Sequence, residues 1–341
     1  MHRRRHGHRH DHRADLTGNA DVPGGDRLAR LLGDVDLGSS KGLELGPLTN
    51  PVVPRSRGDI RYLDHVDTAA LRARYATHVG FDVDAIVEID YASAGRPISA
   101  TVGADAPFDY VIASHVIEHV PDLVGWLADL RRVVADDGFV ALAVPDQRRC
   151  FDAVRQPTCV ADVVDAHLRG AAWPSARQVF DHHFSAASWR GGIAWEADVP
   201  IDELHPVHPL AEAMEVAAEV AATGEYHDVH CWVFTPRSFC RLFTGLQRLG
   251  LVPFDVVTCS EPVGMEFYVR LRPADPAAAS TSIVVGGPER ASEAAVGRAE
   301  LEVAERALDA ARRRIAAIES SRSWRVTRPL RAVNERRARR R

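Results

Sequence analysis

The segment FDYVIASHVIEHVPDLVGWLADLRRVVADDGFVALAVPD, residues 108–146, decides the fold class of this chain. It contains an apolar, β-branched run at 110–114, a helical pattern at 122–138 and a second apolar run at 139–145. Asp122 can cap the helix and Gly138 can end it. A strand, a helix and a further strand in succession are typical of a parallel sheet with crossover helices.

The same alternation extends on both sides of this segment. Further strands are predicted at 42–46, 60–64 and 85–90, and a helix at 67–78. Residues 147–234 lose the alternation and are interpreted as an insertion rich in His, Trp, Pro and Asp. A helix at 235–250 and strands at 254–259 and 265–272 follow, the two strands joined by a short loop. The sequence therefore predicts an α/β domain over 26–273, with a mostly parallel, doubly wound sheet and a C-terminal antiparallel hairpin.

The two ends of the chain differ from this domain in composition. Residues 1–25 are His/Arg-rich and are expected to be disordered. Beyond the domain we expect a linker at 274–290, a C-terminal helix or coiled coil at 291–321 and a basic tail at 322–341.

Charge is segregated along the chain. The net charge is −5, with 42 basic residues, of which Lys41 is the single lysine. The arginine-rich segments 1–13 and 322–341 leave 28 basic and 45 acidic residues, a net of −17, in 14–321. No apolar run approaches the roughly 18 residues that a membrane-spanning helix needs. Five cysteines without a CxxC pair favour reduced thiols and a cytoplasmic protein.

Polar residues and a glycine stand where the predicted strands end, and in a parallel sheet ligands bind outside those ends. Gly46 lets a ligand approach the backbone, and Glu44 can orient the following loop or bind an ammonium group. Asp64 lies eighteen residues beyond Gly46, a spacing typical of an acid that accepts both ribose hydroxyls of a nucleoside. Asp90 ends the third strand, where it could reach a base amino group, and Ser114 ends the fourth.

Three of these stretches carry a family resemblance: GLELGP (42–47), YLDH (62–65) and the segment 108–146. Together they resemble the class I S-adenosylmethionine-dependent methyltransferases, over about residues 38–146 and again over 235–272. The resemblance implies a Rossmann-like fold and S-adenosylmethionine as cofactor. It implies that Glu44 and Gly46 hold the methionine part, Asp64 the ribose and Asp90 the adenine, with Ser114 and His115 near the sulfonium.

The first loop departs from the family pattern. The family usually has a glycine-rich turn that enters a helix, whereas residues 46–58 read GPLTNPVVPRSRG. Three prolines in this stretch predict an extended loop with no long helix directly after the first strand. This departure leaves a second hypothesis open, a non-catalytic binding or scaffold protein with the methyltransferase fold.

Methyl transfer from a sulfonium requires alignment of an acceptor and removal of its proton, so a His or Asp is needed as base. The candidates for catalysis are His115, His182, His183, Asp228 and His230. The sets 181–183 and 228–230 could jointly supply a base or metal ligands, although we assign no metal site. The alternative is that these side chains cap turns and pair with arginines.

The motif His115-x-x-Glu118-His119 has the spacing of an inverted zinc-protease motif, a remote alternative function. That chemistry requires the motif to lie within a helix. Here it directly follows a strand, and Pro121 comes two residues after it, so a methyltransferase is preferred. In that interpretation Glu118 and His119 brace the loop by hydrogen bonds.

The acceptor and partners rest on two resemblances. Similar methyltransferases occur among bacterial surface-polysaccharide genes, and SxSWRVTxPLR (321–331) resembles a tail motif of neighbouring glycosyltransferases. They imply an O-methylated saccharide or glycolipid precursor, or another small-molecule acceptor, in polysaccharide biosynthesis. The Arg-rich tail and the helix before it are expected to contact a protein or the inner face of the membrane rather than nucleic acid.

Overall fold

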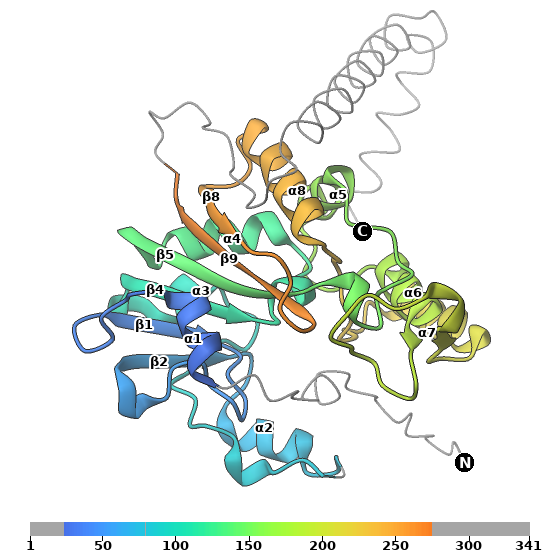
Figure 1. Cartoon of the computed structure of the whole chain (residues 1–341), viewed down its shortest axis with the longest axis horizontal. Coiled ribbons are helices and arrows are strands. Elements are labelled where there is room, and N and C mark those ends of the chain that lie inside the picture. Colours follow the sequence, from blue (N-terminus) through green and yellow to red (C-terminus); the bar gives the residue numbers. More distant parts are fainter. Residues whose placement is uncertain (1–23, 79, 275–341) are drawn as a thin grey trace, which may run out of the picture. The chain divides into compact units, whose positions relative to one another are not determined.

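The computed structural model describes residues 24–78 and 80–274 (Figure 1). The predicted N-terminal tail, apart from its last two residues, lies outside this range. So do the helix or coiled coil, the basic tail and all of the linker except Ala274. Within the described residues, no helix is both long and apolar enough to cross a membrane. All five cysteines fall within the same range and are free thiols.

Seven strands of the described residues form one sheet in the order β3-β2-β1-β4-β5-β9-β8 (Figure 1). They are β1 Lys41–Leu45, β2 Asp59–Asp64, β3 Tyr91–Ala92, β4 Phe108–Ser114, β5 Val134–Pro145, β8 Phe254–Cys259 and β9 Glu266–Pro273. The strands β1 to β5 pair with one another in parallel, while β9 is antiparallel to both β5 and β8. The predicted Rossmann-like sheet and its C-terminal antiparallel hairpin are therefore confirmed.

Helices cover both faces of the sheet. The α-helices are α1 Gly24–Leu32, α2 Thr68–Tyr75, α3 Ile98–Val102, α4 Leu123–Arg131, α5 Val160–Leu168, α6 Ala176–Ser185, α7 Leu210–Thr223 and α8 Pro236–Arg248. In β4, Val111 and Ala113 pack with α3, α4, α5 and α8, whereas Tyr110 and Ile112 pack with α1. This alternation follows from the two-residue period of a strand, and it gives the sheet two apolar cores.

The insertion has more structure than its sequence indicates. It contains α5, α6 and α7, and a short antiparallel pair formed by β6 Ala187–Ser188 and β7 His205–Pro206. Figure 1 shows α6 and α7 packed together near one end of the sheet. Short 3₁₀ helices are η2 Arg55–Arg57, η3 Val83–Ala85, η4 Gly103–Asp105, η5 Ile117–His119, η6 Gln147–Arg149 and η7 Ile201–Glu203.

The structure corrects the strand predicted at 85–90 and the helix predicted at 122–138. The strand expected at 85–90 does not form, and the third strand is Tyr91–Ala92, because the Asp90 carboxylate, rather than a ladder partner, accepts the Tyr62 N–H at 2.7 Å. The helix expected at 122–138 ends at Arg131, although Asp122 caps it as predicted. Gly138 lies inside β5, where a Cβ atom would come within 2.7 Å of the Asp109 carbonyl oxygen of β4. Helix α1, with Leu31 and Leu32 buried, was not predicted.

Gly42 in β1 leaves room for the ring of Tyr110, its register partner in β4. A Cβ atom at Gly42 would lie 2.3 Å from that ring. We predict that Gly42→Ala lowers the free energy of unfolding by about 1–3 kcal/mol, as overpacked cores do. Urea unfolding measures this loss, and the double variant Gly42→Ala/Tyr110→Leu should recover part of it. Equal losses in the single and double variants would contradict the steric explanation.

Candidate active site

Three of the predicted site residues meet at the carboxyl edge of the sheet. Leu45 pairs with Leu63 of β2 and with Ala113 of β4, so the next residues, Gly46, Asp64 and Ser114, are neighbours at that edge. This is the switch point, because the strand order proceeds from β1 to β2 on one side and to β4 on the other. Gly46 has φ of 63°, a conformation that favours glycine, and its N–H donates to the Leu63 carbonyl at 2.8 Å.

Glu44 holds the loop that follows β1. Its carboxylate is buried and accepts the backbone N–H groups of Val52 at 2.7 Å and Val53 at 3.2 Å. Burial raises the pKa of Glu44 to about 7, against the lowering effect of these two hydrogen bonds and of Arg27. Of the two roles considered from sequence, the structure shows the loop-orienting one. As the prolines predicted, no α-helix forms between Gly46 and Gly58.

Asp64 and Asp90 differ in where their carboxylates lie. Asp64 is buried at the edge, and one of its oxygens accepts the His65 N–H at 2.7 Å and lies 2.5 Å from the His65 Nδ1. Asp90 aligns with Tyr62, two residues back from the edge, and pairs with Arg55 at 2.7 Å. The structure therefore brings Asp64 to the edge with Gly46 and Ser114, and it does not bring Asp90 there.

Glu266 organises the other side of this edge. Its carboxylate accepts two hydrogen bonds from Arg27, at 2.8 and 2.9 Å, and lies 2.7 Å from the His115 Nε2. Arg27 also donates to the Ser114 hydroxyl at 2.6 Å. Burial alone would raise the pKa of Glu266, but His115 and Arg27 hold it well below its usual range. His115 itself has φ of 51°, a left-handed conformation uncommon for a non-glycine residue.

A second polar group is buried where the insertion meets the loop after β4. The His230 Nδ1 lies 2.5 Å from the carboxylate of Asp152, which also accepts from Arg155 at 2.8 Å. Burial opposes ionisation of Asp152, yet His230 and Arg155 lower its pKa to about 2. Arg155 reaches Asp181 at 2.8 Å, so this group joins residues from three parts of the insertion.

Glu118 lies between the two groups. One carboxylate oxygen is 3.6 Å from the His115 Nδ1, and one donor atom from each of Glu118, His119 and His230 lies within 4.8 Å of the others. In the described part of the chain, neither carboxylate oxygen of Glu118 has a hydrogen-bond donor. Hydrogen bonding of Glu118 to the surrounding loop, as predicted, therefore does not involve its side chain. It is instead the Glu118 carbonyl that accepts from Cys231 at 2.6 Å and Trp232 at 3.2 Å.

The HxxEH motif does not form a helical zinc-protease site. Ile117–His119 is a single 3₁₀ turn, and α4 starts only at Leu123. His115 is not one of the three residues whose donor atoms converge, and its Nε2 contacts Glu266. His115 thus follows the end of β4, and Glu118 and His119 lie in a tight turn, so the three residues do not share a helical face.

The remaining predicted histidines occupy the insertion. His182 lies near His230, and the backbone N–H of His230 donates to the His182 Nδ1 at 3.3 Å. His183 donates from Nδ1 to the Val179 carbonyl at 2.9 Å and packs against His208, with the rings 4.7 Å apart. Burial lowers the pKa of His183, which favours its neutral form. Asp228 lies 2.9 Å from the His119 Nδ1.

Sequence reasoning missed four residues of these groups: Arg27, Asp152, Arg155 and Glu266. It also missed that the Glu118 side chain lies between the two groups. Glu266 carried a signal, because it is the single acidic residue of the strand pattern MEFYVRLR at 265–272. Arg27 had none, because its partners are 87 and 239 residues away in sequence.

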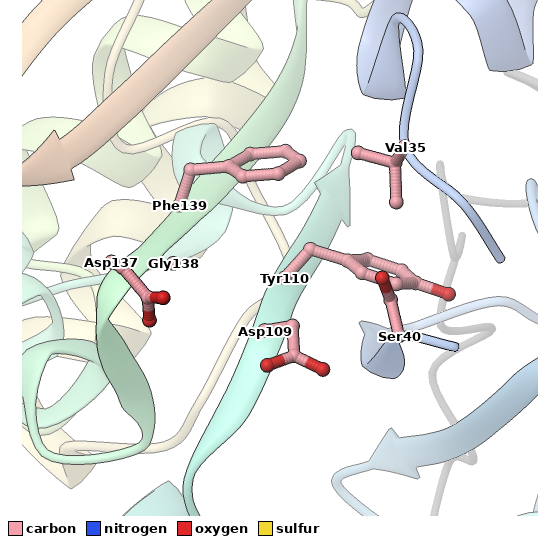
Figure 2. Close-up of a pocket in the computed structure, with 7 residues that line it drawn as sticks. All are labelled: Val35, Ser40, Asp109, Tyr110, Asp137, Gly138 and Phe139. Carbon is pink, nitrogen blue, oxygen red and sulfur yellow. The ribbon is translucent and has the colours of Figure 1, made fainter.

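A cavity of about 240 Å³ lies elsewhere, at the amino ends of β4 and β5 (Figure 2). Figure 2 shows the rings of Tyr110 and Phe139 lining it, with the carboxylates of Asp109 and Asp137 nearby. Since ligands of open parallel sheets bind at the carboxyl ends, this cavity is not the candidate site.

The geometry of the sheet edge agrees with the family to which the sequence is assigned. The family model described as "Methyltransferase domain" matches residues 25–251. The chain belongs to this methyltransferase family. The matched residues of the methyltransferase domain include the whole carboxyl edge from Gly46 to Ser114 and the insertion. Among curated proteins, the chain has no match.

Solved structures similar to this methyltransferase domain include DhpI in its SAH complex, at 18% identity and TM-score 0.35, with 76% of this chain and 90% of that chain covered. A second is the glycopeptide N-methyltransferase MtfA complexed with sinefungin, at 14% identity and TM-score 0.35, covering 76% and 96%. A third is an S-adenosylmethionine dependent methyltransferase from Mesorhizobium loti, at 15% identity and TM-score 0.35, covering 72% and 96%. Similarities this low support no conclusion about the site of this chain.

The raised pKa of Glu44 predicts a pH dependence of stability. Between about pH 4.5 and 7 the folded chain keeps a proton on Glu44 that the unfolded chain releases, so the free energy of unfolding falls as pH rises. Above pH 7 the loss reaches about 3 kcal/mol. We predict that Glu44→Gln removes this decline, measured by urea unfolding at a series of pH values. The exposed control Glu215→Gln should keep the decline, and a decline unchanged in Glu44→Gln would contradict the assignment.

Proposed function

We propose that this chain is a class I methyltransferase that uses S-adenosylmethionine to methylate an oxygen of a saccharide or glycolipid precursor. The observation that carries the proposal is the alignment of Gly46, Asp64 and Ser114 at the switch point of the sheet. Membership of the methyltransferase family supports the reaction class. The acceptor rests on the resemblances of the whole sequence and of residues 321–331.

The residues at this edge fit the cofactor in backbone conformation and in charge. Gly46 has the positive φ that brings backbone close to a ligand. The buried acids Glu44, Asp64 and Glu266 favour a ligand that carries a cationic sulfonium. When bound, S-adenosylmethionine supplies an activated methyl group. On this proposal Gly46 and the loop held by Glu44 contact its methionine part, and Asp64 accepts its ribose hydroxyls.

His115 is the base candidate nearest this edge. Its Nε2 contacts Glu266, and its Nδ1 faces Glu118 at 3.6 Å. These two contacts hold the imidazole in a fixed orientation beside Ser114, as a positioned proton acceptor requires. His182, His183, Asp228 and His230 lie in the insertion and stay candidates for a supporting role.

The place of the reaction follows from the proposed acceptor. A glycolipid precursor would bring the chain to the inner face of the cytoplasmic membrane. The Arg-rich segment 322–341 would then add about 1 kcal/mol of attraction for each charge near anionic head groups. A protein partner would use the same segment and the predicted helix before it.

The alternative is a binding or scaffold protein with the same fold and no catalysis. One observation favours it: the Glu44 carboxylate is occupied by the backbone of the first loop, which has no glycine-rich turn into a helix. A chain that has lost its cofactor would show no binding of S-adenosylmethionine.

We predict that the wild-type chain binds S-adenosylmethionine and S-adenosylhomocysteine in isothermal titration calorimetry. Asp64→Asn should weaken both at least about tenfold, because hydrogen bonds to a charged acceptor contribute about 1.5–3 kcal/mol. Asp59→Asn is the matched control, an exposed Asp at the other end of β2 that pairs with Arg61, and should bind as the wild type does. The absence of binding to the wild type, or equal affinities in both variants, would contradict the cofactor assignment.

A further inference from the structure

We propose that Glu118, His119 and His230 form a binding site for a divalent transition-metal ion, with zinc as the best fit. The site would join the turn after β4 to the end of the insertion. The proposal does not depend on whether the acceptor is a saccharide. Three observations carry it: an uncompensated buried carboxylate, two oriented imidazoles and the convergence of their donor atoms.

The first observation is the environment of Glu118. The residue is 0% exposed, and within the described residues both its carboxylate oxygens lack a hydrogen-bond donor. Its nearest basic contact, the His115 Nδ1, lies 3.6 Å away, beyond hydrogen-bond range. A buried carboxylate is strongly unfavourable unless it is paired, protonated or coordinated to a metal ion. A bound cation would supply that compensation.

The second observation is the orientation of the two histidines. The His230 Nδ1 is fixed by Asp152 at 2.5 Å, and the His119 Nδ1 lies 2.9 Å from Asp228. Within the described part of the chain, the buried Nε2 of His230 and both ring nitrogens of His119 have no hydrogen-bond partner. At His230 the Asp152 carboxylate fixes the tautomer, which leaves the lone pair of Nε2 for a metal. At His119 the Asp228 carboxylate faces Nδ1 without a hydrogen bond, so the ring has a free donor atom for a metal.

The third observation is convergence. One donor atom from each of the three side chains lies within 4.8 Å of the others. Around a tetrahedral zinc ion, donors at about 2.1 Å from the metal are about 3.4 Å apart, so small side-chain rotations complete the set. Two imidazoles favour zinc, cobalt or iron over magnesium and calcium, which prefer oxygen ligands.

Two His and one Glu leave a fourth position on a tetrahedral ion, as in catalytic zinc sites where water or substrate occupies it. Glu118 also faces His115, the base candidate at the sheet edge. The ion would therefore lie near His115 and would fix the insertion to the turn after β4.

The test uses the full-length chain, stripped with a chelator and titrated with Zn²⁺ against a chromophoric competitor, and separately with Co²⁺ followed by visible absorption. We expect one tight ion per chain with a tetrahedral Co²⁺ spectrum. His119→Gln and His230→Gln should each weaken zinc binding by at least about 100-fold, since loss of even an outer-shell partner costs 10–100-fold.

His205→Gln, an exposed histidine of the same insertion, is the matched control and should bind zinc as the wild type does. Residues 1–13 are His-rich, and any weak zinc binding there is the same in all variants. The difference in zinc affinity between the wild type and a variant therefore reports on the buried site.

Glu118→Gln keeps the side-chain shape and gives a second readout, the thermal unfolding temperature. Zinc should raise this temperature in the wild type and much less in Glu118→Gln, whereas without metal the variant should unfold at the higher temperature. Equal zinc affinities and equal zinc-induced shifts in the wild type and all variants would overturn the site. Calorimetry with S-adenosylmethionine on the same samples separates that failure from a failure of the proposed function.

Discussion

The buried carboxylate of Glu266 is the interaction on which the candidate active site depends. It receives hydrogen bonds from Arg27 of α1 and from Tyr268, and it contacts His115 after β4. Burying an acid is unfavourable unless it is paired, so these partners are held together. The consequence is that α1, β9 and the end of β4 share one arrangement, with Ser114 positioned through Arg27 and His115 held at a positive φ.

The same principle explains how the insertion relates to the sheet. Asp152 compensates His230 and Arg155, which come from opposite ends of the insertion. Among the buried acids of residues 24–78 and 80–274, Glu118 is the one without such compensation, and it lies where the two polar groups meet. The other buried acids of the described residues have hydrogen-bond partners, and Glu118 does not. A cation bound between Glu118, His119 and His230 best explains this difference.

Much of the fold could be predicted from sequence, because strand and helix periodicity are local properties. Residues 108–146 predicted a strand, a helix and a strand, and the ends of β1, β2 and β4 were right to within two residues. The third strand was not, because Asp90 uses its side chain in place of a ladder bond. Gly138 ended no helix, since its lack of a side chain serves the contact with β4. Long-range pairings, such as Arg27 with Glu266, produce no periodic pattern in the sequence.

The candidate site, like the fold, was predictable only in its local features. Strand-end residues Gly46, Asp64 and Ser114 follow from topology alone, whereas Asp152 and the linking role of Glu118 depend on how the insertion folds back. The central claim is that the cofactor binds at the carboxyl edge beside these strand ends. A crystal structure with S-adenosylhomocysteine tests it most directly. Ligand density is expected against Gly46, Asp64 and Ser114. Density in the cavity between Tyr110 and Phe139, or at any site away from this edge, would contradict it.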